Sequence, residues 1–309
     1  MALNEKRFDG RVAIITGAGG GLGRDYALLL ASRGARVVVN DLGTSRQGEG
    51  ADIGMAAAVV AEIRAAGGEA VANGDSVATA VGCAGIVKTA LDTWGKVDIL
   101  IHNATINRRG PFRDLSFQDF SAVLDVHLSG AFHLAKEVFP RMCDAGYGRI
   151  VFVASIAGLY GERNVAAYCT AKGAINGLSN ALALEGLDHG VGVNCIVPAA
   201  KTRLVEGRDV EGFPPWGPEL VAPALAWLAH EDCKASGKLL VSLAGRMAEA
   251  FPAETRGVFQ PEWSIEDVAA RSDEIFDRAH VETFSSVPRG FHEHLGFSFE
   301  MARAGTAND

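Results

Sequence analysis

The sequence predicts an α/β fold: a Rossmann-type, doubly wound, seven-stranded parallel sheet with helices on both faces, followed by a C-terminal helical appendage. Three observations support this prediction. Short apolar and β-branched runs alternate with longer helical stretches, which is typical of a parallel sheet covered on both faces. A glycine cluster, residues 17–23, directly follows the first of these runs. From about residue 249 onward, prolines and glycines break the chain into short pieces and the alternation ends.

The first elements follow from local composition. Residues 12–15 (Val-Ala-Ile-Ile) form a short apolar run that predicts a buried strand, and the helix after it, 22–32, ends before Gly34. Residues 36–40 are rich in valine and predict the second strand. The stretch 43–52 is polar and rich in glycine, so it predicts a long loop behind that strand.

The same two patterns repeat as far as residue 248. Each further strand is a short run of β-branched and apolar residues, and each further helix is a longer stretch between two such runs. We expect strands at 69–72, 97–101, 149–153, 191–197 and 238–241, and helices at 53–66, up to Trp94, at 117–145 and from Tyr168 toward His189. Seven strands fit one domain better than two, so residues 1–248 are expected to form a single dinucleotide-binding and catalytic domain.

Residues 249–309 are expected to form an extension of this domain. Ser264, followed three residues later by Asp267, predicts a capped amphipathic helix over 264–277. We expect the extension to pack on the core or on a neighbouring subunit.

Composition argues against several other classes of protein. The net charge of −8 gives no electrostatic reason to expect a nucleic acid or an anionic membrane as partner. The five cysteines are scattered, without a Cys-x-x-Cys pair, which favours a reducing compartment over a disulfide framework or a zinc site. The start lacks the apolar core of a signal peptide, and no apolar run reaches membrane-spanning length. We therefore expect a cytoplasmic protein without a metal site.

The glycine cluster that follows Thr16 is typical of a dinucleotide site. Glycines let the chain turn sharply and bring backbone N–H groups against a pyrophosphate, and the next helix points its positive end at the same group. Asp41 follows the second strand, where a carboxylate can bind the adenosine ribose hydroxyls and repel a 2′-phosphate. This favours NAD over NADP, although Arg46 in the next loop could reach such a phosphate. A solvated loop acid is the plainer interpretation of Asp41.

Two more polar residues end predicted strands at the same edge of the sheet. Asp75 ends the third strand and could contact the adenine amino group, or it could be an ordinary turn residue. Asn103 ends the fourth strand beside the expected coenzyme crevice, and a turn-capping asparagine is its alternative interpretation.

Tyr168 and Lys172 are four residues apart in a predicted helix and therefore share one face. A nearby ammonium stabilises a phenolate, so Lys172 is expected to lower the pKa of Tyr168. Tyr168 then accepts a proton in alcohol oxidation and donates one in ketone reduction. Ser155 follows the fifth strand and can donate to the substrate oxygen. With the glycine turn, these residues predict alcohol–ketone redox chemistry on a nicotinamide dinucleotide.

This pattern resembles the short-chain dehydrogenase/reductase family over roughly residues 8–245. The residues that carry the resemblance are Thr16-Gly17-x-x-x-Gly21-x-Gly23, Ser155 and Tyr168-x-x-x-Lys172. The resemblance implies an Asn-Ser-Tyr-Lys tetrad and a homodimer or homotetramer built on two long helices and the last strand. The coenzyme-binding residues expected from motifs and resemblance together are Gly17, Gly19, Gly21, Leu22, Gly23, Asp41, Asp75, Asn103, Tyr168, Lys172 and Pro198.

Two positions depart from the family pattern. The family's Asn-Asn-Ala-Gly after the fourth strand reads His102-Asn103-Ala104-Thr105 here. The tetrad asparagine, which in the family kinks the helix and holds a relay water near the lysine, is His127. His127 could take this role through its carbonyl or its ring, and it joins Ser155, Tyr168 and Lys172 as an expected catalytic residue. A structural helix histidine is the alternative.

A closer likeness concerns the substrate. Residues 39–43, 125–128, 148–151 and 197–198 resemble the (3R)-hydroxyacyl-CoA dehydrogenase modules of type-2 peroxisomal multifunctional enzymes and their bacterial stand-alone relatives. The likeness implies NAD-dependent oxidation of a 3-hydroxyacyl-CoA to the 3-oxoacyl-CoA. CoA phosphates need basic residues at the cleft mouth, for which Arg108-Arg109 and Lys201-Thr202-Arg203 are candidates; solvated loop charge is the alternative.

Two other functions fit the same residues. A hydroxysteroid or other bulky alicyclic alcohol dehydrogenase would use the same catalytic machinery. A non-catalytic dinucleotide-binding protein would need the glycine turn alone, and the intact Ser155, Tyr168 and Lys172 argue against it.

Overall fold

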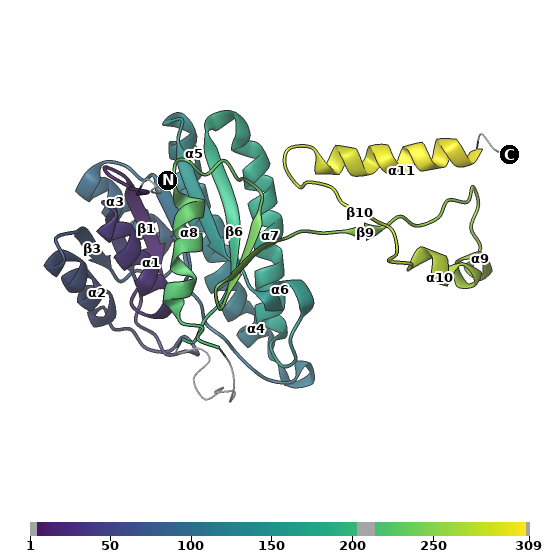
Figure 1. Cartoon of the computed structure of the whole chain (residues 1–309). Coiled ribbons are helices and arrows are strands. Elements are labelled where there is room, and N and C mark those ends of the chain that lie inside the picture. The colour runs from purple at the N-terminus through teal and green to yellow at the C-terminus, as the bar shows by residue number, and fades with distance from the viewer. Residues whose placement is uncertain (1–4, 203–213, 307–309) are drawn as a thin grey trace. The chain divides into compact units, whose positions relative to one another are not determined.

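The computed structural model describes residues 5–202 and 214–306, and its contacts divide the chain into two units, Met1–Glu249 and Ala250–Asp309 (Figure 1). The first unit is built on an eight-stranded sheet in the order β3-β2-β1-β4-β5-β6-β7-β8. The strands are β1 (Val12–Thr16), β2 (Arg36–Asn40), β3 (Glu69–Asn73), β4 (Ile99–His102), β5 (Gly148–Val153), β6 (Val191–Ala199), β7 (Leu239–Leu243) and β8 (Arg246–Ala250). Neighbouring strands from β3 to β7 pair in parallel. The predicted Rossmann-type α/β class is confirmed.

The eighth strand corrects the predicted count of seven. β7 and β8 are joined by two residues, Ala244 and Gly245, whose φ angles are +46° and +81°. Positive φ at both central residues is typical of a two-residue β-hairpin turn. This turn is favoured because its backbone twist matches the twist of the two strands that it joins. The last strand therefore runs antiparallel to its neighbour and ends the sheet with a hairpin.

Helices cover both faces of the sheet. On one face, Tyr26 of α1, Val59 of α2 and Leu225 of α8 share an apolar cluster with alternate strand residues such as Ile15. The intervening strand residues, Ile14 among them, are also buried and face the opposite helices. The helices of this unit are α1 (Gly21–Ser32), α2 (Gly54–Ala65), α3 (Ala80–Trp94), α4 (Phe117–Leu124), α5 (Gly130–Asp144), α6 (Ile156–Tyr160), α7 (Ala166–Glu185) and α8 (Ala222–Ala229).

The predicted single helix over 117–145 is interrupted. Between α4 and α5 lies a π-helical turn, η2 (Asp125–Ser129), which takes in an extra residue and carries His127. A single π-helical turn inside an α-helix is frequent at functional sites, because it changes the direction in which one side chain points.

The carboxyl ends of the parallel strands define the functional edge of this sheet. β1 lies between β2 and β4, so the chain order reverses between β1 and β4. In open α/β sheets, ligands bind in the crevice outside the strand ends at such a switch point. Thr16 of β1 and His102 of β4 are paired in register there.

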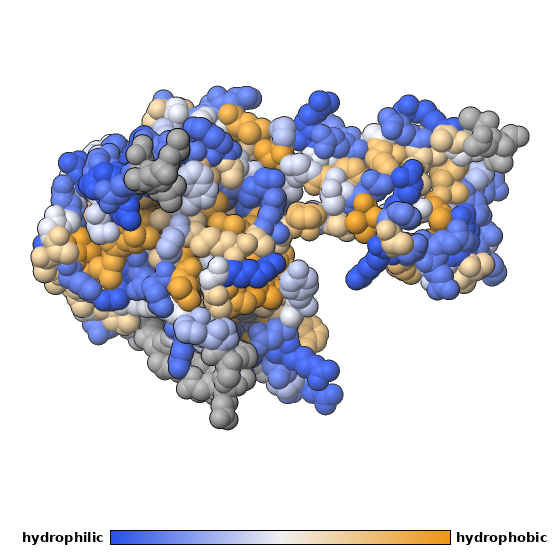
Figure 2. Space-filling model, in the orientation of Figure 1, coloured by the Kyte–Doolittle hydropathy of each residue, from blue (hydrophilic) through white to orange (hydrophobic). Residues whose placement is uncertain are grey.

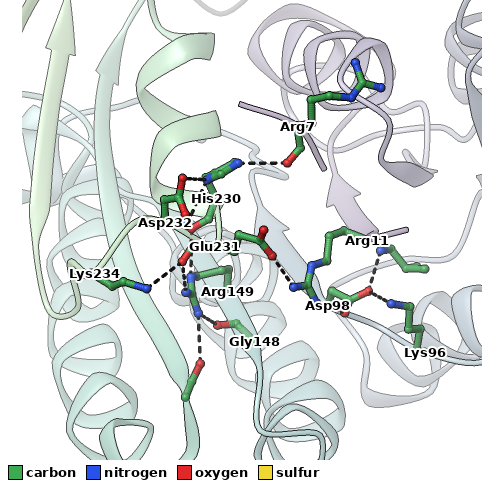
Figure 3. A network of polar contacts seen from close by, with 12 residues as sticks. Arg7, Arg11, Lys96, Asp98, Gly148, Arg149, His230, Glu231, Asp232 and Lys234 are labelled. Carbon is green, nitrogen blue, oxygen red and sulfur yellow. Dashed lines mark hydrogen bonds and ion pairs between the residues drawn. The ribbon is translucent and has the colours of Figure 1, made fainter. Parts of the chain in front are cut away.

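A network of ionic and polar contacts fixes the opposite edge (Figure 3). The buried guanidinium of Arg149 donates to four carbonyls, those of Gly148, Gly190, His230 and Glu231, at 2.8–3.3 Å. Asp98 accepts a hydrogen bond from the Val12 backbone and pairs with Arg11 and Lys96. Since these partners lie far from the carboxyl ends, the network is structural: it holds the amino ends of β1 and β5 and the segment after α8 together.

The second unit is small and combines three helices with one short strand pair in its described part. Its strands β9 (Glu254–Thr255) and β10 (Val281–Glu282) pair antiparallel, and its helices are α9 (Ile265–Ala270), α10 (Ser272–Ile275) and α11 (Gly290–Thr306). The predicted capping box of Ser264 and Asp267 is present, but the predicted helix 264–277 is split at Arg271. Both hydrophilic and hydrophobic side chains reach its surface (Figure 2). Ile265 and Phe291 are exposed apolar residues of this unit. Its packing on the core or on a neighbouring subunit stays a prediction.

In the described ranges, 5–202 and 214–306, every helix is too short or too polar to cross a membrane.

Candidate active site

The structure brings Tyr168 and Lys172 together on one face of α7. The Lys172 ammonium nitrogen lies 5.6 Å from the centre of the Tyr168 ring. Its side chain is almost fully buried, and Nζ donates a hydrogen bond of 2.5 Å to the carbonyl of Val153, at the end of β5. The amine is thus fixed beneath the phenol at the carboxyl edge of the sheet.

Ser155 completes this group from a different element. It is the N-cap of α6, where its Oγ accepts a hydrogen bond of 3.2 Å from the Ala157 backbone. Its hydroxyl also acts on Tyr168, where it favours the phenolate. α6 and α7 approach closely because position 158 is glycine: a Cβ on Gly158 would lie 2.6 Å from the carbonyl carbon of Lys172. A missing side chain therefore sets the distance between Ser155 and Tyr168.

Burial controls the protonation of this group. It raises the pKa of Tyr168, although the hydrogen bond to Ser155 acts in the opposite direction. It also lowers the pKa of Lys172 from 10.5 to about 7. The expectation that Lys172 lowers the pKa of Tyr168 is not met in this structure, because desolvation disfavours the charged form of both side chains. Near neutral pH, Lys172 changes its charge readily.

His127 lies against Tyr168 with its ring fully buried. The two rings meet edge to face, with centres 5.4 Å apart. Nε2 of His127 lies 2.9 Å from the carbonyl oxygen of Ile106 and 3.2 Å from Oγ1 of Thr105, both in the loop after β4. Burial, together with the charge of Lys172, lowers the pKa of His127 well below its usual value. As a neutral ring, it connects η2 to that loop and supports the face of Tyr168; its catalytic role stays a prediction.

His102 connects β4 to the π-helical turn, and the sequence indicated it only as a departure from the family pattern. Thr16 Oγ1 accepts hydrogen bonds from the backbone of Asn103 and Ala104, so its own hydrogen points to Nδ1 of His102, 3.0 Å away. Nε2 of His102 must then carry the ring hydrogen, which it donates to the carbonyls of Val126 and His127 at 3.1 and 3.2 Å. The carbonyl of His127 thus accepts from His102, and this bond anchors η2 to β4.

The glycine turn is held by backbone contacts that leave no room for side chains. Gly17 has a φ of +64°, and a Cβ there would lie 2.7 Å from Cα of Ala104. A Cβ on Gly23 would overlap the carbonyl oxygen of Gly17. Asn103 donates from Nδ2 to the carbonyls of Thr16 and Gly17, at 3.1 and 2.9 Å. Its position therefore fits the predicted place beside the coenzyme crevice, where it braces the turn.

The residues at this turn fit a dinucleotide. α1 begins at Gly21 after Gly20 as N-cap, with no side-chain cap, so its first N–H groups are open to an anion such as a pyrophosphate. Leu22 lies in this first turn and packs against the core. Thr202, after β6, lies 3.4 Å from the place a Cβ on Gly21 would take. Thr202 was predicted only as part of a basic segment, whose Arg203 lies outside the described residues.

Asp41 is at the end of β2, where the prediction placed a ribose contact. Its two oxygens accept hydrogen bonds from the backbone of Gly19 (2.8 Å) and Gly43 (2.7 Å). Each carboxylate oxygen keeps a further lone pair for a ribose hydroxyl. Asp41 thus connects the glycine turn to the long loop, which a purely solvated loop acid would not do.

The other predicted coenzyme contacts are less direct. Asp75 accepts a hydrogen bond of 2.8 Å from the side chain of Asn73, and its own backbone donates to that same side chain. This is the arrangement of a turn residue, and adenine contact stays a prediction. Pro198 lies near the carboxyl end of β6 and is half-buried.

Comparison with known proteins agrees with this geometry. The sequence matches the short chain dehydrogenase family over residues 11–208. The chain belongs to this family. A short-chain type dehydrogenase/reductase of Mycobacterium tuberculosis is 45% identical over 269 residues, which are 86% of this chain and 94% of the relative.

Two further similarities are informative. The peroxisomal multifunctional enzyme type 2 of Drosophila melanogaster is 47% identical over 241 residues, covering 77% of this chain and 40% of that protein, so the chain spans less than half of this relative. Its full-length structure has a TM-score of 0.78 at 34% identity, covering 95% of this chain and 49% of that chain. A 7α-hydroxysteroid dehydrogenase complexed with NADH and 7-oxo glycochenodeoxycholic acid has a TM-score of 0.71 at 30% identity, covering 77% of this chain and 95% of that chain.

The close packing of α6 on α7 predicts a selective effect of Gly158→Ala. The added methyl must push the backbone of Lys172 away, so we expect kcat to fall at least about tenfold while coenzyme affinity changes little. Gly177→Ala is the matched control on α7, because nothing lies within 4 Å of a Cβ there. Steady-state kinetics of both variants provide the measurement, and equal kcat values would contradict the role of Gly158.

The lowered pKa of Lys172 predicts how stability depends on pH. Between pH 7 and 9 the folded protein has released the Lys172 proton while the unfolded chain, with an ordinary pKa of 10.5, retains it. The unfolded state then binds more protons, so the free energy of unfolding rises with pH, by up to about 1.4 kcal/mol per pH unit from this residue. Urea unfolding at several pH values should show this slope in the wild type, and Lys172→Met should lack it.

The comparison with Lys172→Met separates the contribution of Lys172 to the pH dependence of the free energy of unfolding from the contributions of other groups. The pKa of the buried Cys83 and Cys195 rises to about 12, which makes the folded state less favourable as pH passes 9 in both proteins. Parallel stability curves for the two proteins would contradict a desolvated amine at position 172.

Proposed function

We propose that this short-chain dehydrogenase is an NAD-dependent enzyme that oxidises the secondary alcohol of a 3-hydroxyacyl-CoA to the 3-oxoacyl-CoA. The observation that supports it most is the group at the carboxyl edge: the hydroxyl of Ser155 acts on the phenol of Tyr168, and the buried amine of Lys172 is fixed beneath the Tyr168 ring. These are a donor for a substrate oxygen, a proton acceptor and a source of positive charge. The glycine turn that fits a dinucleotide lies at the same edge.

The chain's own groups can carry out the proton chemistry. The Ser155 hydroxyl donates to the carbinol oxygen and orients it toward Tyr168. The Tyr168 oxygen takes the hydroxyl proton as the carbon becomes a carbonyl. Because burial raises the pKa of Tyr168, a positive charge must stabilise its phenolate, and protonated Lys172, 5.6 Å from the centre of the ring, can supply it. Bound NAD would supply the hydride acceptor.

The coenzyme assignment rests on Asp41. A carboxylate at the end of β2 accepts hydrogen bonds from ribose hydroxyls and repels a 2′-phosphate, which supports NAD over NADP. The backbone bonds of Asp41 to Gly19 and Gly43 hold this charge at the turn.

The acyl-CoA substrate is supported by the likeness of the segments around Asp41 and His127 to hydroxyacyl-CoA dehydrogenase modules, together with the identity to a peroxisomal multifunctional enzyme. The second candidate is a hydroxysteroid dehydrogenase, favoured by the structural likeness to such an enzyme. We further propose a cytoplasmic homodimer or homotetramer in which residues 249–309 pack on their own core or on a neighbour.

The two substrates are separated by kinetics. We expect kcat/KM for (3R)-3-hydroxyacyl-CoA thioesters to exceed that for free hydroxysteroids by at least about 100-fold, because only the thioesters match the proposed site. Assays of both series at saturating NAD provide the comparison. The reverse order would replace the acyl-CoA assignment with the steroid one.

Tyr168→Phe tests the proton acceptor. The variant keeps the ring that packs on His127 and loses only the hydroxyl, so oxidation should fall by about 1,000-fold or more while NADH binds within about twofold of wild type. Tyr160→Phe, on an exposed tyrosine of α6, is the control and should leave both quantities unchanged. Turnover near the wild-type rate in Tyr168→Phe would falsify the assignment.

Asp41→Asn tests the coenzyme preference. An asparagine oxygen can still accept a backbone hydrogen bond, but the negative charge is gone, so the ratio of kcat/KM for NAD to that for NADP should fall by roughly 10-fold. Asp52→Asn, in the same loop, serves as the charge-matched control. A wild type that already prefers NADP would overturn this assignment.

A further inference from the structure

A basic pocket lies beside the catalytic group, between two loops that are far apart in sequence. It measures about 420 Å³. Its lining comes from the long loop after β2 (Arg46 and Gln47), the loop after β4 (Asn107 to Gly110) and the start of the next helical segment (Asp114, Leu115 and Asp119). A backbone hydrogen bond of 3.0 Å from Asn107 to Arg46 joins the two loops.

The lining of the pocket has neighbours in common with the catalytic group. Leu115 lines the pocket and, like Tyr168, packs against the buried apolar cluster that contains Ile106. On another side, Gly110 donates to the carbonyl of Asn164, in the segment between Ser155 and Tyr168. A ligand whose reacting carbon lies at Tyr168 can therefore extend into this pocket.

The charge of the pocket and its polar atoms without hydrogen-bond partners indicate the chemistry of its ligand. Three guanidinium groups line it against two carboxylates, in a chain whose net charge is −8. Nε of Arg108 and Oδ1 of Asn107 are both buried without a hydrogen-bond partner among the described residues. A ligand that satisfies both must offer an acceptor to the guanidinium and a donor to the amide oxygen.

The carboxylate partners of Arg108 and Arg109 can be replaced by a ligand anion. Arg108 lies 3.4 Å from Asp119, and Arg109 lies 2.9 Å from Glu162, with about two fifths of the Arg109 and Glu162 side chains exposed. Exposed pairs of this kind contribute little to stability, whereas a phosphate binds guanidinium through charge-assisted, bidentate hydrogen bonds. A phosphate can thus replace Glu162 at Arg109 at small cost.

We infer that this pocket binds the phosphate-bearing nucleotide end of the substrate's CoA, with Arg108 and Arg109 on the phosphate oxygens and Asn107 accepting from an N–H group of the same ligand. The inference rests on the proposed function for the identity of the substrate. The 2′-phosphate of NADP has the same chemistry and is the second possible source, since Arg46 comes from the loop after β2.

Arg109→Gln tests the inference, with Arg113→Gln as the matched control. Arg113 is an exposed arginine four residues away that does not line the pocket. In the wild type, kcat/KM for a 3-hydroxyacyl-CoA should exceed that for the same acyl group on pantetheine by at least about tenfold. Arg109→Gln should remove most of this advantage through KM, leave the pantetheine ester unchanged and leave the KM for NADP unchanged. Arg113→Gln should behave as the wild type.

Other outcomes would overturn the inference. Equal use of both thioesters by the wild type, or an equal loss on both in Arg109→Gln, would exclude a phosphate site for CoA. A rise in the KM for NADP alone would assign the pocket to the coenzyme.

A wrong substrate assignment can be distinguished from a wrong assignment of the pocket, because ligand binding to the pocket is measured separately from oxidation. Adenosine 3′,5′-bisphosphate is titrated calorimetrically into the NAD-saturated protein. Binding that weakens about tenfold in Arg109→Gln and not in Arg113→Gln supports the pocket even if neither thioester is oxidised. No detectable binding to the wild type, or equal binding to all three proteins, would contradict it.

Discussion

The site depends on the removal of one amine from water. Lys172 is almost fully buried, donates to the carbonyl of Val153 and lies beneath the ring of Tyr168. Burial makes the charged forms of both residues costly, so each responds strongly to any charge brought near it. The surrounding structure keeps this pair in place: Gly158 lets α6 approach α7, and His127 packs against the ring. The Ser155 hydroxyl favours the phenolate of Tyr168.

Close backbone approaches, rather than side-chain contacts, set the geometry of the edge. Gly17 lies against Ala104, Gly23 against Gly17, and Gly158 against the backbone of Lys172. A chain of hydrogen bonds through Thr16 and His102 then connects β1 and β4 to the π-helical turn that carries His127. The coenzyme turn and the catalytic group are therefore parts of one rigid framework.

Much of this framework is visible in the sequence because it depends on local patterns. Alternating apolar runs predict the parallel sheet, glycine spacing predicts the turn after β1, and the four-residue spacing of Tyr168 and Lys172 places them on one helical face. The parts that sequence reasoning missed depend on contacts between distant segments. The tautomer of His102 follows from Thr16, 86 residues away, and the π-helical turn follows from where His102 and Ile106 lie. The two-residue hairpin before β8 and the glycine-containing α11 have weak local signals. The basic pocket is formed where the loop after β2 meets the loop after β4, which are far apart in sequence.

Titration of the Lys172 amine itself is the most direct test of the buried site. Selective ¹³C labelling of lysine, with Lys172→Arg to assign the resonance, allows its chemical shift to be followed by NMR from pH 5 to pH 11. We expect a midpoint near pH 7, because burial lowers the pKa of this amine. An ordinary midpoint near the unperturbed value of about 10.4 would show a solvated amine. It would contradict the buried, easily deprotonated Lys172 on which the site depends.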